Sequence, residues 1–95
     1  MTPEGKVKKK VDALLDKYKC YYRKPVTGGY GKAALDYEGC SRGRFFAVET
    51  KPAGEKPTDR QLFIAETIRE AGGRAFVVIG DDGLAELEQW LATSE

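Results

Sequence analysis

The sequence predicts an α/β fold in which a mixed sheet is flanked by helices, in the order helix, three strands, helix, strand, helix. Apolar residues recur at helical spacing in three segments, and two apolar runs near residues 45–48 and 75–79 are typical of buried strands. The 95 residues are enough for one domain, residues 1–95, with one modest core. Short links between the first three strands favour an antiparallel meander, and the helix before the last strand favours a right-handed parallel crossover.

The first helix begins at a recognisable start signal. Thr2 can act as N-cap, Pro3 fits the first turn, and Glu4 is favoured by the helix dipole. The helix is expected to end near Lys19. Its apolar face repeats at helical spacing through Val7, Val11, Leu14, Leu15 and Tyr18.

Three strands are predicted next, separated by glycine-containing turns. We expect strands at residues 20–26, 32–37 and 44–51, with turns at residues 27–31 and 38–43. The third of these has the strongest strand pattern in the chain.

The second half of the chain has clearer signals for where its helices and strands begin and end. Thr58 can cap a helix over residues 59–71, and Gly72 with Gly73 marks its end. A strand at residues 74–79, a turn, and a helix at residues 84–92 complete the prediction.

The amino-acid composition limits the possible metal ligands more than it limits the possible binding partners. The formal net charge is only +1, although lysines gather in the first third of the chain and acids near its end. There is no histidine, so any metal site must rely on oxygen ligands, which suits Mg²⁺ or Mn²⁺. Two cysteines indicate neither a disulfide framework nor a zinc site, and a cytoplasmic setting is expected. No apolar run approaches membrane-spanning length.

The segment with the most chemistry follows the third predicted strand. Alternation along a strand puts Glu49 and Lys51 on one side and Thr50 on the other. Asp36 precedes this strand at the end of another extended stretch. We expect Asp36 and Glu49 to hold a divalent cation and Lys51 to act on a phosphate beside it. The alternative is a plain Glu49–Lys51 ion pair at a sheet edge.

These residues resemble the PD-(D/E)XK nuclease superfamily, and within it the virus-type replication–repair nuclease (VRR-NUC) domain. The matching positions are Asp36, the run Glu49-Thr50-Lys51, Gln61, and Glu4 in the first helix. The segments 54–61 and 72–78 look like the same family's tail. Leu35 departs from the pattern, because the family has proline there.

The resemblance implies a restriction-endonuclease-like core and a Mg²⁺- or Mn²⁺-dependent endonuclease acting on DNA. Similarity to Holliday junction resolvases implies branched DNA as substrate and a homodimer, and a stand-alone domain of this size suggests a phage or bacterial origin. It also implies the backbone carbonyl of Thr50 as a further metal ligand. Glu4 could reach the metal through water, or could be only a dipole-favoured acid. Gln61 could position water, phosphate or Lys51, or could be only a solvated helix residue.

Basic side chains around this segment are candidates for DNA-backbone contacts, which position DNA without reading sequence. The alternative is a solvated helix face. The candidates are Lys6, Lys8, Lys9, Lys10, Lys24, Lys32, Arg42 and Arg44. Two further functions stay open: a non-catalytic DNA-binding or recruitment module on the same fold, and a metal-dependent ribonuclease.

Overall fold

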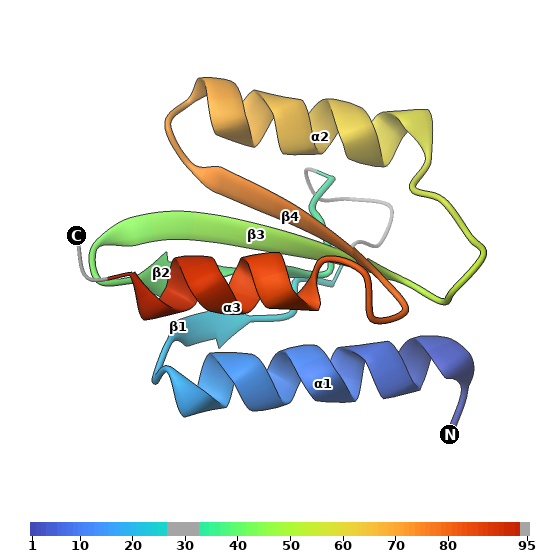
Figure 1. Cartoon of the computed structure of the whole chain (residues 1–95). Helices are drawn as coiled ribbons and strands as arrows, with labels where there is room; N and C mark the ends of the chain where they lie inside the picture. The colour runs from blue at the N-terminus through green and yellow to red at the C-terminus, as the bar shows by residue number, and fades with distance from the viewer. Residues whose placement is uncertain (27–32, 94–95) are drawn as a thin grey trace.

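The computed structural model describes residues 1–26 and 33–93, and it contains a four-stranded sheet with three helices (Figure 1). The predicted element order and the mixed sheet are confirmed. Strands lie in the order β1-β2-β3-β4. The elements are α1 (Pro3–Lys17), β1 (Tyr21–Arg23), β2 (Tyr37–Ser41), β3 (Arg44–Lys51), α2 (Asp59–Glu70), β4 (Arg74–Ile79) and α3 (Leu84–Ala92).

Both expected strand connections are present. β1, β2 and β3 form an antiparallel meander, with Tyr37 opposite Val48 where β2 begins. β3 then pairs with β4 in parallel, after the chain has crossed over through α2. In this register β3 continues past the start of β2, so its last residues, Glu49 to Lys51, have β4 on one side only.

The helices cover the two faces of the sheet unequally. α1 and α3 pack on one face and α2 on the other (Figure 1). The larger core lies under α1 and α3, and a smaller one under α2 joins Leu35, Ala47, Ala65 and Ala75. α2 packs mainly against β4 and β3, so among the described residues it covers this half of the face rather than the half formed by β1 and β2.

The second strand was predicted wrongly. It was expected at residues 32–37 and a turn at 38–43, but the strand occupies Tyr37–Ser41. The turn is only Arg42 and Gly43, whose φ angles of 53° and 80° suit a tight two-residue hairpin. β1 is also shorter than expected, with three residues. Position 32 lies outside the described residues.

A glycine is required at position 39, inside β2, because the backbone of β1 lies very close to it. A Cβ at this position would lie 2.1 Å from the carbonyl oxygen of Tyr21 and 2.8 Å from the Cα of Tyr22. The backbone of β1 therefore passes directly over Gly39, and only glycine allows this approach.

Helix α1 is fixed to the sheet by a buried tyrosine. The single proton of the Tyr37 hydroxyl faces two acceptors on α1, Asp12 Oδ1 at 2.6 Å and the backbone oxygen of Lys8 at 3.0 Å. Burial and the nearby Asp12 carboxylate raise the pKa of Tyr37, so it stays protonated and donates. This contact sets the position of α1 against the start of β2.

The second half of the chain matches its prediction closely. β4 and α3 have the expected bounds, and α2 ends at Glu70, one residue earlier than expected.

Helix α1 ends at Lys17 rather than near Lys19, whose φ of 56° breaks the helix. Within the described residues, no helix combines the length and apolar character that crossing a bilayer requires.

We predict that Gly39→Ala destabilises the protein by more than about 3 kcal/mol, because the added methyl group would collide with backbone rather than with a flexible side chain. Urea unfolding measures the loss. Cys40→Ala, at the neighbouring exposed position, is the control and should cost under about 1 kcal/mol. Equal losses in both variants would contradict the close strand crossing.

Candidate functional site

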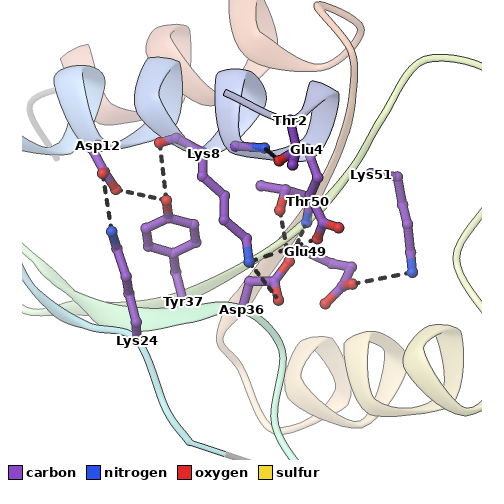
Figure 2. A network of polar contacts seen from close by, with 11 residues as sticks. Thr2, Glu4, Lys8, Asp12, Lys24, Asp36, Tyr37, Glu49, Thr50 and Lys51 are labelled. Atoms are coloured by element: carbon purple, nitrogen blue, oxygen red, sulfur yellow. Dashed lines mark hydrogen bonds and ion pairs between the residues drawn. The ribbon is translucent and has the colours of Figure 1, made fainter.

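Asp36 lies where β2 begins and binds the end of β3 through its side chain. Its Oδ2 atom accepts hydrogen bonds from the Thr50 backbone N–H at 2.8 Å and from the Thr50 hydroxyl at 2.7 Å (Figure 2). β2 starts opposite Val48, so the carboxylate satisfies a peptide group that β2 no longer reaches. The second oxygen, Oδ1, takes no part in these bonds.

Glu49 and Lys51 lie on one side of β3, as strand alternation predicts. Glu49 Oε2 is 3.7 Å from Lys51 Nζ, and only 4% of the Glu49 side chain is exposed. Thr50 between them is fully buried and bonds Asp36. The geometry thus brings Asp36, Glu49 and Lys51 together at the end of β3 (Figure 2).

Glu49 is the electrostatically perturbed group of this site. Burial first and the neighbouring Asp36 carboxylate second raise the pKa of Glu49 to about 7, against the lowering effects of Lys51 and of a hydrogen bond from the Asp36 backbone. Glu4 on α1 also raises this pKa, so the three acids share one electrostatic environment. A buried carboxylate beside a second one is stabilised by a cation.

Helix α1 supplies two further charged groups. Glu4 and Lys8 lie one turn apart, with Glu4 Oε2 3.6 Å from Lys8 Nζ. The same ammonium group is 3.9 Å from Asp36 Oδ1, the oxygen that Thr50 leaves free. Lys8 was expected only as a phosphate contact. The helical spacing to Glu4 could have indicated the first pair, but the contact to Asp36 depends on how α1 docks.

The donors at this site fit a hard divalent cation. Asp36 and Glu49 offer carboxylate oxygens, and Thr50 offers a peptide carbonyl, which are the ligands that Mg²⁺ and Mn²⁺ prefer. Within residues 1–26 and 33–93, no three His, Cys, Asp or Glu side chains are grouped closely enough to form a metal site. Glu4 is therefore an outer member of the site, and its role as a ligand stays a prediction.

Gln61 forms hydrogen bonds that begin α2, a role included in neither of the two alternatives considered for it, a site residue or a solvated helix residue. Its Oε1 accepts from the Thr58 backbone N–H at 2.9 Å, and its own N–H donates to Thr58 Oγ1 at 3.1 Å. This capping box begins α2. No hydrogen bond joins Gln61 to Lys51 in the part of the chain that the structure describes, and its role in the site stays a prediction.

The predicted DNA-contacting residues divide into two groups. Lys10 pairs with Asp81 and Lys24 with Asp12, so both ammonium groups already have carboxylate partners. Arg42 and Arg44 bond backbone oxygens at the end of α3, and Arg44 also stacks 4.2 Å over Trp90. They lie at the start of β3, whereas the acids lie at its end (Figure 1).

Three of the remaining candidate lysines lie on α1, and of these Lys8 contacts the acids. Lys6 and Lys9 are exposed, and neither forms an ion pair among the residues described. Together with Lys8, they are called the basic rim of α1, although helical spacing places Lys6 about 160° around the helix from Lys8. Lys32 falls outside the described residues, so its predicted contact is not placed.

Comparison with known proteins relates the chain to one described domain. No protein-family model and no curated protein matches the sequence. A solved structure described as "VRR_NUC domain" matches over 100% of both chains, with a TM-score of 0.75 and 25% sequence identity. The likeness supports the VRR-NUC resemblance seen in the sequence, and the α/β order of elements agrees with that fold.

We predict that Glu49→Gln stabilises the metal-free protein above pH 7. The folded state keeps the Glu49 proton up to about pH 7, whereas the unfolded chain releases it near its ordinary pKa of 4.5. Stability therefore falls as pH rises between these values, by on the order of 3 kcal/mol. Urea unfolding in EDTA at pH 5 and pH 8 should show the gain of Glu49→Gln only at pH 8.

Glu70→Gln is the matched control, because Glu70 is exposed at the end of α2. It should leave the pH dependence of stability unchanged. A wild-type protein whose stability does not fall between pH 5 and pH 8 would contradict the assigned environment of Glu49.

Proposed function

We propose that this protein is a metal-dependent endonuclease that hydrolyses phosphodiester bonds in DNA. The observation that carries the proposal is the meeting of Asp36, Glu49 and Lys51 at the end of β3. Full-length likeness to a VRR_NUC domain supports a nuclease domain. Similarity to PD-(D/E)XK enzymes and to Holliday junction resolvases is part of the proposal and rests on the sequence motif.

Mg²⁺ or Mn²⁺ would be held by Asp36, Glu49 and the Thr50 carbonyl, with Glu4 in the outer shell. The bound ion would neutralise phosphate charge and make a water molecule more acidic. The chain itself provides a rigid holder, because two hydrogen bonds from Thr50 fix the Asp36 carboxylate. These bonds occupy Oδ2 and leave Oδ1 for the cation.

Lys51 acts on the substrate side of this arrangement. Its side chain is 17% exposed, so the ammonium group can reach a ligand while it stays 3.7 Å from Glu49. There it stabilises the negative charge on the phosphate oxygens or orients the attacking water. Hydrolysis adds water across the bond, forming a new P–O bond and breaking the bond to the sugar oxygen.

The basic rim on α1 would guide the DNA backbone to the site. Lys6 and Lys9 are exposed on the helix that carries Glu4 and Lys8. Contacts of this kind bind phosphate without sequence preference, so the proposed specificity is for DNA shape, with branched DNA such as a four-way junction as the favoured substrate.

We predict that Asp36→Asn and Lys51→Met each lower cleavage of a Mn²⁺-supplied DNA junction by at least about 100-fold. The asparagine oxygen can still accept both Thr50 hydrogen bonds, so the fold should be kept. Cleavage is measured on labelled junction, flap and single-stranded DNA. Binding of the same DNA in Ca²⁺ should persist.

Asp59→Asn is the control, because Asp59 is an exposed acid in the first turn of α2. Matched RNA substrates test the ribonuclease alternative. The enzymatic proposal fails if the wild-type protein leaves all of these substrates intact. If the wild-type protein still binds DNA in that case, the non-catalytic DNA-binding and recruitment module is supported instead.

The homodimer expected from the resemblance has a candidate surface. An apolar groove of about 520 Å³ lies between α2 and the uncovered part of the sheet, and Phe45 and Phe63 line it. Phe63 is 72% exposed, which is unusual for a phenylalanine in a lone domain. Glu38 and Arg60 also line the groove, but Glu38 is already paired with Arg23 at 2.8 Å, so the apolar side chains rather than charge pairs would carry a two-fold contact.

We predict that Phe63→Asp shifts a dimer of the wild-type protein to monomer in sedimentation velocity experiments. The substitution places a charge in the proposed apolar contact, while the exposed side chain adds little to the fold. Gln89→Asp on α3, on the other face of the sheet, should leave the dimer intact. A wild-type monomer at high concentration would contradict the dimer.

A further inference from the structure

Lys8 occupies an unusual position for a surface lysine. Its ammonium group lies 3.6 Å from Glu4 Oε2 and 3.9 Å from Asp36 Oδ1, between α1 and the start of β2. Figure 2 shows the side chain extending from α1 toward Asp36, beside Glu49 and Thr50. Since Thr50 occupies Oδ2, Lys8 faces the one Asp36 oxygen that is left for a cation.

We propose that Lys8 is a placeholder cation, which neutralises Asp36 and Glu4 in the metal-free protein and leaves when a divalent cation binds. The inference rests on the proposed function and adds a regulatory element to the same site. It concerns the competition between a side chain and the metal for one set of oxygens.

The charges of the site support an exchange rather than joint occupancy. Glu4, Asp36 and Glu49 supply three carboxylates, and Lys8 and Lys51 supply two ammonium groups. A divalent cation added beside Lys51 alone balances the three carboxylates. If Lys8 stayed as well, it would face a doubly charged ion of its own sign at short range, where repulsion is strong.

Lys8 can also move out at little cost. Its side chain is 38% exposed, and both of its ion-pair distances exceed hydrogen-bonding length. Only its backbone oxygen is fixed, by the Tyr37 hydroxyl. The flexible stem can therefore swing to the rim beside Lys9, where the ammonium group becomes available to a phosphate of the substrate.

We predict that Lys8→Gln raises the affinity for Mn²⁺ by about fivefold, the change that corresponds to losing one partly exposed ion pair. Isothermal titration calorimetry with Mn²⁺ alone, without DNA, measures this affinity. Lys8→Arg keeps the competing charge and should stay within about twofold of the wild-type value. In metal-free buffer, Lys8→Gln should lower the unfolding temperature, because Asp36 and Glu4 lose their partner.

Lys9→Gln is the matched control, because it removes the same charge from the next position of α1 without removing a contact to Asp36. The placeholder proposal is overturned if Lys8→Gln binds Mn²⁺ no more tightly than Lys9→Gln, or binds it more weakly than the wild-type protein. If every variant binds Mn²⁺ equally, only this inference fails. If the wild-type protein binds none, the proposed metal site fails together with it.

Discussion

The two hydrogen bonds between Asp36 and Thr50 connect the fold of this protein to its candidate chemistry. β3 is longer than β2, so its last peptide groups would lack partners on that side. The Asp36 carboxylate supplies the missing acceptor, and the Thr50 hydroxyl adds a second bond to the same oxygen. The Asp36 side chain thus satisfies the peptide group at the end of β3 with one oxygen. Its other oxygen faces the space that Glu49 and Lys8 share. The same constraint explains why the acids meet although they are far apart in the chain.

Helix α1 completes the site because its position is set by the sheet. The Tyr37 hydroxyl contacts the backbone of α1 next to Asp36, and this places Glu4 and Lys8 at the end of β3. Gathering three acids in one region, with Glu49 buried and Glu4 and Asp36 partly exposed, is costly unless cations balance them. Lys51 does so from β3 and Lys8 from α1, and together they keep the metal-free arrangement compatible with a folded state.

Local patterns in the sequence were sufficient for most of the fold and part of the site. Strands β3 and β4 and helix α3 follow from apolar runs and turn signals within each segment. β2 could not be found in this way, because Gly39 is normally a turn signal and here reflects the backbone of β1 passing close by. The Glu49–Lys51 pair follows from strand alternation. The contact of Lys8 with Asp36 depends on how α1 docks on the sheet, which spacing along one chain does not encode.

Trp90, the only tryptophan of the chain, has a consequence for spectroscopy. Its ring is buried against Phe46 and Phe76 and lies under the guanidinium group of Arg44, at the start of β3. The acids lie at the other end of that strand. Tryptophan fluorescence of this protein therefore reports on the main core and is insensitive to what occupies the acidic end, where an introduced fluorophore would be needed.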